Sequence, residues 1–286
     1  MSTTSDPSII PDEPPDALRF HRHAPLLSAP REIYRARLLI RALAEREIRA
    51  QYKQAALGIA WAVITPVMLM IVLTVFFQRV GSIDTKGVPY SLFAYIGLVP
   101  WNFFSGSLTT GGLSLVNQMN LVNKLNCPRE VFPLSSITVV AFNSTIAGIV
   151  LVLLFAFNRF APRGTTPLAI LPFVVQVLFT VAVTLLVSCT TVYLRDLRHA
   201  LPILLQLGFF ATPIAYGIDT IAEPYRPLYA LLNPMAPVID SYRQTVLYGN
   251  APDWGLLGCG ALSTAVLLLG ALKLFRRLEM GFADVA

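Results

Sequence analysis

A few acidic side chains lie close to long apolar stretches, where they are candidates for acid–base chemistry. These acids are Asp196, Asp219, Glu223 and Asp240. General acid–base catalysis needs positioned groups that reach the same reacting atoms, and no two of these four make a recognisable catalytic pair. A membrane enzyme that works from its loops is therefore the least favoured of the alternatives considered below.

Motifs for nucleotide hydrolysis and for metal binding are missing. No Gly is followed by Lys anywhere in the chain, so there is no Walker A loop to hold phosphates. Neither G-x-S-x-G nor H-E-x-x-H occurs, and both are signatures of hydrolytic sites. The cysteines Cys127, Cys189 and Cys259 have no C-x-x-C spacing, and His21 and His23 fit a solvated pair. We expect no catalytic residue, cofactor or metal on this chain.

Long windows without charge are the strongest signal in the sequence. No Asp, Glu, Lys, Arg or His occurs in residues 54–78, 87–123, 131–158, 164–194, 200–218 or 254–272. A membrane-spanning helix needs about 20 mostly apolar residues, so the sequence predicts an all-α integral membrane protein. The expected spans are about 58–80, 89–116, 131–157, 167–192, 200–218 and 254–275. They lack the buried acids and bases of ion-driven pumps, which indicates another energy source.

The distribution of Lys and Arg predicts the orientation. With the N-terminus inside and six alternating spans, the inside segments hold 16 of the 22 basic residues and the outside segments hold 6. Cytoplasmic loops are enriched in Lys and Arg, so both termini are expected in the cytoplasm. Residues 117–130 and 193–199 then form cytoplasmic loops, and 219–253 lies outside. The net charge of +6 is thereby explained without nucleic acid.

The two segments before the first span are predicted to differ in structure. Residues 1–30 are rich in proline and have no apolar core, which predicts a disordered cytoplasmic tail. Residues 31–53 predict a basic amphipathic helix lying in the headgroup layer or against a partner. Its apolar arc comprises Ile33, Ala36, Ile40, Leu43, Ala44 and Ile48.

Three loops carry polar features. A short helix is expected from Asn120 to Asn126, although a plain connecting loop is an alternative interpretation. The sequence after the fourth span favours either a salt-bridge cluster or interfacial anchoring by Arg195, Asp196 and Arg198. Within 219–253, PVIDSYRQTVLYG predicts a short amphipathic helix that ends at Gly249.

Aromatic residues lie in or near the ends of the spans. Most residues of this kind form interfacial belts or pack against lipid, and a wall for a sugar chain is the alternative. The residues considered are Trp61, Trp101, Phe103, Phe104, Phe209, Phe210 and Tyr216.

The order of these features resembles the permease subunits of ABC type-2 exporters of cell-surface polysaccharides, especially O-antigen permeases. The resemblance covers about residues 31–280 and rests on four stretches: REIRAQYKQAALGIAWAVITPVMLM, NLVNKLNCPREVFPLSS, YLRDLRHALPILLQLGFFATPIAY and LLNPMAPVIDSYRQTVLYG. The resemblance implies a channel made by two copies of the chain and driven by two separate ATP-binding subunits. ATP and Mg would be bound by those partners.

The resemblance also assigns roles to segments. The helix 31–53 resembles an interface helix, and 219–253 resembles extracytoplasmic gate helices. The segment that couples to the ATPase would comprise Asn120, Leu121, Asn123, Lys124, Leu125, Pro128, Arg129 and Glu130. The aromatic wall would comprise Trp61, Trp101, Phe104, Phe209, Phe210 and Tyr216.

The implied cargo is a polyprenyl-diphosphate-linked glycan that crosses the inner membrane. Its diphosphate would meet Arg46, Arg49 and Lys53 at the cytoplasmic mouth. A type-2 permease for a drug or lipid is the first alternative, and an enzyme acting on polyprenyl-linked sugars is the second.

Overall fold

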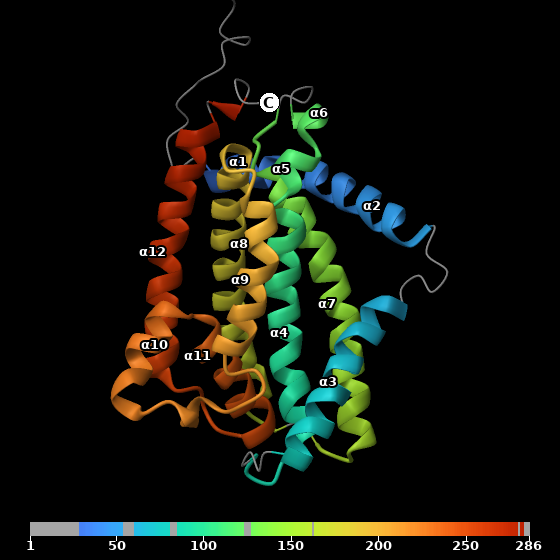
Figure 1. Ribbon diagram of the computed structural model, residues 1–286, viewed down its shortest axis with the longest axis vertical. Helices are drawn as coiled ribbons and strands as arrows, with labels where there is room; N and C mark the ends of the chain where they lie inside the picture. The colour runs from blue at the N-terminus through green and yellow to red at the C-terminus, as the bar shows by residue number, and fades with distance from the viewer. Residues whose placement is uncertain are drawn as a thin grey trace, which may run out of the picture.

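The protein is a bundle of long helices with shorter helices at both ends (Figure 1). The structure is a computed structural model that describes residues 29–53, 60–80, 85–122, 127–161, 163–279 and 281–282. All regular structure in these ranges is helical, which confirms the all-α part of the predicted fold class. The predicted tail lies outside the described residues, apart from its last two positions.

The long helices run along one another in Figure 1. They are α3 (Ala60–Val80), α4 (Tyr90–Gly111), α7 (Val131–Phe157), α8 (Ile170–Tyr193), α9 (Leu197–Ala211) and α12 (Trp254–Glu279). A 3-10 turn, η2 (Thr166–Ala169), leads into α8. The helices agree closely with four of the predicted ranges. For 89–116, α4 ends five residues early. The largest difference is at 200–218, where α9 begins three residues early and ends seven residues early.

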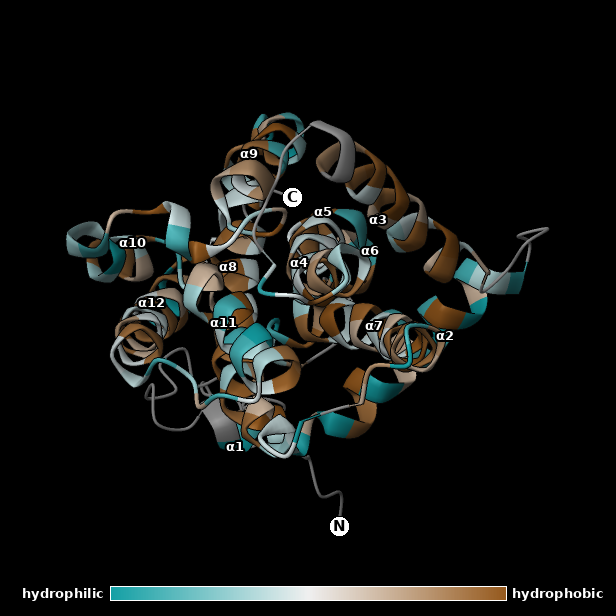
Figure 2. Cartoon of the chain, turned by 90° about the horizontal axis from the view of Figure 1, so that it is seen from below, coloured by the Kyte–Doolittle hydropathy of each residue, from teal (hydrophilic) through white to brown (hydrophobic). Residues whose placement is uncertain are grey.

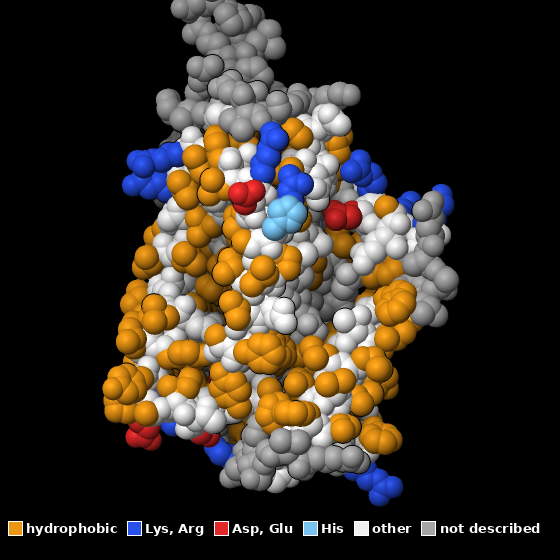
Figure 3. Space-filling view, viewed as in Figure 1, with side chains coloured by type: hydrophobic (Ala, Val, Ile, Leu, Met, Phe, Trp, Pro, Cys, Tyr) orange, Lys and Arg blue, Asp and Glu red, His pale blue; other side chains and the backbone are white. Residues whose placement is uncertain are grey.

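Four helical stretches in the described residues are long and apolar enough to cross a membrane: Ala60–Phe77, Val131–Phe157, Thr166–Tyr193 and Trp254–Glu279. Figure 3 shows hydrophobic side chains covering the middle of the visible face, with charged side chains gathered toward its ends. A belt of this kind matches the hydrocarbon core of a bilayer. The chain is therefore a multi-pass membrane protein.

The helix α4 is at the centre of the bundle. Seen end-on, it lies among α3, α7, α8 and α9, and it contacts all four (Figure 2). It buries 15 of its 22 residues. Because its surroundings are protein, α4 carries more polar residues than a helix that faces lipid. This explains why it is less apolar than α3, α7 and α8.

The end of α4 packs closely against α8. A Cβ on Gly111 would lie 2.6 Å from Thr184 Cγ2, and one on Gly112 would lie 2.6 Å from Val187 Cγ1. The glycines therefore allow the end of α4 to approach α8 closely. After Gly112 the chain continues in two short helices, α5 (Ser114–Asn117) and α6 (Met119–Val122).

The basic segment before the bundle forms two helices, α1 (Ala29–Arg35) and α2 (Arg37–Lys53), separated by a turn at Ala36. Figure 1 shows α2 crossing the same end of the bundle that carries α6 and the end of α12. We call this end the α2 end. Leu43 and Ala44 are buried, which confirms the centre of the predicted apolar arc.

The opposite end, which we call the α11 end, carries the segment between α9 and α12 (Figure 1). This segment comprises η3 (Ile218–Thr220), η4 (Glu223–Tyr225), α10 (Arg226–Leu232), α11 (Met235–Tyr242) and the π-helix η5 (Arg243–Tyr248). Gly249 follows with φ 77° in the left-handed region. The left-handed region is favourable for glycine, so the predicted helix ends at the predicted residue.

Candidate functional site

The predicted coupling residues lie at the α2 end, on both sides of a gap in the described chain. Asn120 and Leu121 are on α6, where Asn120 is exposed and its neighbour Val122 is buried. Pro128, Arg129 and Glu130 lead into α7. The other predicted residues are outside the described ranges: Asn123, Lys124 and Leu125.

Glu130 is part of an ion-pair network inside the α2 end. Its carboxylate oxygen Oε1 lies 3.6 Å from Arg276 Nε on α12, and Arg276 Nη2 lies 3.2 Å from Glu32 Oε2 on α1. Glu130 is only 2% exposed, and this burial raises the pKa of its carboxyl group while Arg276 opposes the rise. We call Glu32, Glu130 and Arg276 the Arg276 network. It joins α1, the start of α7 and the end of α12.

Arg129 reinforces the same junction. Its Nη1 donates a hydrogen bond to the backbone carbonyl of Glu279, and its guanidinium lies 5.5 Å from the ring centre of Phe282. Phe282 packs in an apolar cluster that also contains Leu43 of α2 and Val122 of α6. The segment predicted to couple to a partner is thus tied to α2 and to the end of α12.

The basic residues predicted to meet a diphosphate are exposed on α2. Arg46, Arg49 and Lys53 all face away from the bundle core. Arg49 Nη2 lies 4.0 Å from Glu45 Oε2, and Arg41 forms a 3.0 Å pair with the same carboxylate. Salt bridges this exposed contribute little to stability, so these side chains remain available for an anionic ligand or surface.

Of the two alternatives for the α8–α9 turn, the salt-bridge cluster is not formed, and interfacial anchoring stays a prediction. Arg195, Asp196 and Arg198 are all exposed, and Arg198 Nε donates to the backbone carbonyl of Arg195 at 3.2 Å. No ion pair joins Asp196 to either arginine within the described turn. Water solvates these charges well, so a surface ion pair has little to gain.

The predicted wall aromatics divide into two groups. Trp61 on α3 and Phe210 on α9 are 55% and 66% exposed. Trp101 and Phe104 on α4 are buried within this chain at 6% and 8% exposed. Phe209 is partly buried against Trp101, at 6.0 Å between ring centres.

Core packing explains the second group. Phe104 stacks on Phe179 of α8 at 5.2 Å between ring centres, and Trp101 fills the space between α4 and α9. Tyr216 donates from its hydroxyl to the carbonyl of Phe210 at 3.0 Å. The rings of Trp101 and Phe104 are therefore occupied by protein contacts in this chain.

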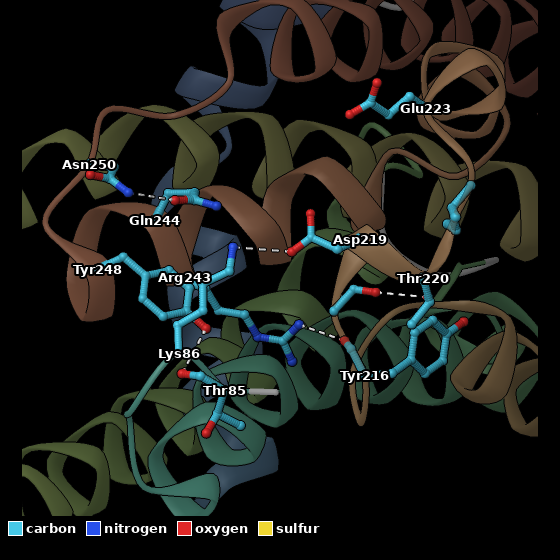
Figure 4. Close-up of polar contacts among 12 residues, drawn as sticks. Thr85, Lys86, Tyr216, Asp219, Thr220, Glu223, Arg243, Gln244, Tyr248 and Asn250 are labelled. Carbon is cyan, nitrogen blue, oxygen red and sulfur yellow. Dashed lines mark hydrogen bonds and ion pairs between the residues drawn. The ribbon is translucent and has the colours of Figure 1, made fainter. Parts of the chain in front are cut away.

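At the α11 end, the acids Asp219 and Glu223 pair with basic side chains and do not form a pair of acids. Asp219 Oδ2 lies 3.1 Å from Lys86 Nζ (Figure 4). Arg226 lies 3.8 Å from both Asp219 and Glu223. Asp240 is 8% exposed, and burial raises its pKa to about 6. No group of metal-binding side chains occurs among the described residues.

Comparison with known proteins identifies the family. The family model described as "ABC-2 type transporter" matches residues 38–247. This chain belongs to the ABC-2 type transporter family. It is 33% identical over 256 residues to the O-antigen export system permease protein RfbA of Myxococcus xanthus, covering 89% of this chain and 97% of that protein.

Two further relatives of this ABC-2 chain are more distant. RfbA of Klebsiella pneumoniae, also an O-antigen export system permease protein, is 27% identical to this chain. The match covers 86% of this chain and 94% of that protein. The polysialic acid transport protein KpsM of Escherichia coli is 24% identical, and the match covers 85% of this chain and 94% of that protein. The matches extend over nearly the whole length of each relative.

Two arginines of this ABC-2 chain were not singled out from its sequence. In the sequence, Arg276 is one of several basic residues after the last span, and Arg243 lies within an amphipathic pattern. Arg243 is 1% exposed, and burial lowers its pKa to about 10, which leaves it charged at neutral pH. The sequence offered only a weak signal, because the surrounding stretch VIDSYRQTVL also contains Asp240 and several other polar residues.

Proposed function

We propose that this chain is the membrane-spanning permease subunit of an ATP-driven polysaccharide exporter. The cargo would be a polyprenyl-diphosphate-linked glycan resembling O-antigen, moved from the cytoplasm across the inner membrane. The observation that carries the proposal is the 33% identity to an O-antigen export permease over 97% of that protein's length. The match to a polysialic acid transport protein supports a polysaccharide cargo.

In the proposed topology, α3, α4, α7, α8, α9 and α12 all cross the membrane. The α2 end faces the cytoplasm together with both termini, and the α11 end faces outward with its short helices as a gate. The excess of Lys and Arg in the segments assigned to the cytoplasm, 16 against 6, supports this orientation.

The proposed working unit contains two copies of this chain and two ATP-binding subunits. The ATPases, which carry ATP and Mg, would contact α2 and the segment 120–130. The absence of a Walker A loop from the full sequence supports a separate source of energy. The ties from Glu130 to Arg276 and from Arg129 to Glu279 give a force applied there a route into α7 and α12.

For the translocation path, we propose a weakly polar wall at the interface of the two copies. Trp61 and Phe210 have the exposed rings that such a wall requires, whereas Phe209 and Tyr216 would contribute their edges. Trp101 and Phe104 would support the wall from behind, because they are buried in the single chain. Arg46, Arg49 and Lys53 would attract the diphosphate of the cargo at the cytoplasmic mouth.

Reconstitution of the chain tests this proposal. The purified chain in proteoliposomes should hydrolyse no ATP, and addition of its ATP-binding partner should give hydrolysis that lipid-linked glycan stimulates. Substitution of the Walker A lysine in the partner is the matched control and should abolish hydrolysis. ATP hydrolysis by the chain alone contradicts the proposal.

The first alternative is a type-2 permease for a drug or simple lipid. It has the same architecture, but the full-length matches to two kinds of polysaccharide transport protein favour a glycan. The second alternative is an enzyme that acts on polyprenyl-linked sugars. The pairing of Asp219 and Glu223 with basic side chains argues against an acid–base role for them.

A further inference from the structure

The helix α9 is loosely packed in this chain. Of its 15 residues only Leu201 is buried, in contrast to the 15 buried residues of α4. Its length at 1.5 Å per residue is about 22 Å, which is shorter than the roughly 30 Å hydrocarbon core of a bilayer. The chain therefore leaves helical structure at Ala211, before it reaches the end of the bundle.

Non-helical backbone at this depth needs hydrogen-bond partners, because lipid supplies none. We call residues 211–217, which connect α9 to η3, the α9 break. Tyr229 of α10 donates from its hydroxyl to the carbonyl of Ala211, and Asn233 Nδ2 donates to Thr212 Oγ1 at 2.9 Å. The short helices at the α11 end thus supply the first partners of the α9 break.

Arg243 supplies the remaining partners with one side chain. Its Nη1 donates to the carbonyls of Pro213 at 2.8 Å and Tyr216 at 2.9 Å, and its Nη2 donates to that of Ile214. Figure 4 shows the guanidinium pointing from η5 toward Tyr216. The planar fork of arginine suits several acceptors at once, and here it holds three carbonyls of one irregular segment.

The same guanidinium also contacts α4. Its Nη2 donates to the carbonyl of Phe93 at 3.3 Å, and its carbon Cζ lies 3.6 Å from the ring centre of Phe93. A Cβ on Gly97 would lie 2.9 Å from Nη2 and 3.2 Å from the Ile214 oxygen. Glycine at 97 therefore leaves the space that the guanidinium occupies.

The Arg243 contacts are made to backbone rather than to an acid. Among the described residues no carboxylate lies within 4 Å of the guanidinium, and Nε has no hydrogen-bond partner. A buried charge without an ion pair is costly, so this arginine is not explained as a simple salt bridge. Its contacts instead fix the shape of the α9 break against η5 and α4.

We propose that Arg243 is a positioning residue that makes α9 and the short helices of the α11 end move as one unit. Because α9 has little other packing in the chain, a displacement that begins at the α2 end reaches the exit through this connection. The assignment of direction and cargo rests on the proposed export function, whereas the connection itself rests on the hydrogen bonds and burial given above.

The test uses the full exporter complex in proteoliposomes with Arg243→Lys and Gly97→Ala. In Arg243→Lys the charge is kept, but a single ammonium group cannot hold four carbonyls. In Gly97→Ala the added methyl group displaces Nη2 of Arg243, while every donor of the guanidinium is kept. For Arg243→Lys we expect the glycan exported per ATP hydrolysed to fall about tenfold, the factor that one lost charged hydrogen bond gives. Gly97→Ala should act in the same direction with a smaller effect.

A native thiol provides a readout that does not need cargo. Cys259 on α12 packs against Ile218 and Ala230 of the short helices. In a background with Cys127→Ser and Cys189→Ala, we expect N-ethylmaleimide to label Cys259 about tenfold faster in Arg243→Lys, because the short helices loosen. Glu223→Gln, at a side chain 86% exposed in the same segment, is the matched control and should change neither readout.

Each result decides the proposal. Reduced export per ATP with retained ATP hydrolysis and faster labelling supports it. Unchanged coupling in Arg243→Lys, or equal loss of hydrolysis and export, overturns it. If Arg243→Lys does not reach the membrane, Gly97→Ala decides, and normal coupling in that variant overturns the proposal. Faster labelling in a complex whose wild type exports no glycan would leave the connection standing and contradict the export function alone.

Discussion

Two arginines join segments at opposite ends of the molecule, and they do so with different partners. Arg276 at the α2 end is 13% exposed and pairs with carboxylates from α1 and from the start of α7. Arg243 at the α11 end is 1% exposed and holds backbone carbonyls. An ion pair between side chains transmits force between helices without dictating their backbone shape, whereas hydrogen bonds to carbonyls fix the backbone itself.

The difference fits the proposed roles of the two ends. The α2 end would receive a partner, so exchangeable ion pairs among separate segments are sufficient there. The α11 end has to stabilise the irregular backbone of the α9 break, where each buried and unsatisfied carbonyl is costly. The comparison leads to four predictions, given from the largest expected effect to the smallest.

Removing the buried guanidinium should have the largest effect on stability. Arg243→Met leaves the carbonyls of Phe93, Pro213, Ile214 and Tyr216 without their donor. We expect a loss of about 3 kcal/mol, within the range for unsatisfied buried polar groups, measured by unfolding in detergent. Glu223→Gln, at a side chain 86% exposed in the same segment, is the control, and an equal loss there would contradict the account.

The Arg276 network should tolerate an exchange of charges. Arg276→Glu alone places three carboxylates together and should cost about 2 kcal/mol, since it breaks a largely buried pair. Adding Glu130→Arg restores an attraction at the same 3.6 Å contact and should recover a good part of that loss. The double-mutant cycle measures the recovery by unfolding. If the double variant recovers none of the lost stability, the helices of the α2 end are held together by the shape of their contacts and not by the charges of this network.

Asp240 should make the α11 end more stable in mild acid. Burial raises the pKa of Asp240 to about 6, while Arg243 and Lys86 lower it and Asp219 raises it further. A folded-state pKa above the unfolded value means that the folded state binds the proton more tightly, so stability falls as pH rises from about 4 to 6. Cys259 should therefore label more slowly at pH 5 than at pH 7.5, after correction for thiolate fraction.

The control for this pH effect is Asp240→Asn, which removes the titrating group and keeps its size. We expect the corrected labelling rates at the two pH values to converge in this variant. A pH dependence that persists unchanged would assign the effect to another group.

The smallest effect is expected on the outer face of α2. Arg41 and Glu45 pair at 3.0 Å with side chains 79% and 49% exposed. Arg41→Gln should cost less than about 0.5 kcal/mol, as solvent screens such pairs. A cost similar to that of Arg276→Glu would remove the distinction between exposed and buried pairs on which the comparison depends.

The sequence predicted the elements whose signals are local. The charge-free windows placed α3, α7 and α8 to within a few residues, and Gly249 ended the predicted helix because its φ favours glycine. The early end of α9 was less visible, since the backbone after Ala211 has its hydrogen-bond partners in distant segments, at Tyr229 and Arg243. Local patterns therefore gave the helices but not all of their ends.

The two arginine-centred sites could not be predicted in the same way. Arg276 meets Glu32 across 244 positions of sequence, and Arg243 meets Phe93 across 150. Neither pairing leaves a periodic pattern or motif. The predicted wall also mixed exposed and buried rings, because Trp101 and Trp61 look alike in sequence and differ only in what packs against them.

The most direct test of the proposed function is made in cells that lack this chain. We predict that undecaprenyl-linked glycan accumulates at the cytoplasmic face of the inner membrane while surface polysaccharide disappears, and that the wild-type gene reverses both. Gly97→Ala should reverse them only in part. Normal surface polysaccharide, with no accumulation of the lipid-linked glycan, would contradict the proposal that this chain exports it.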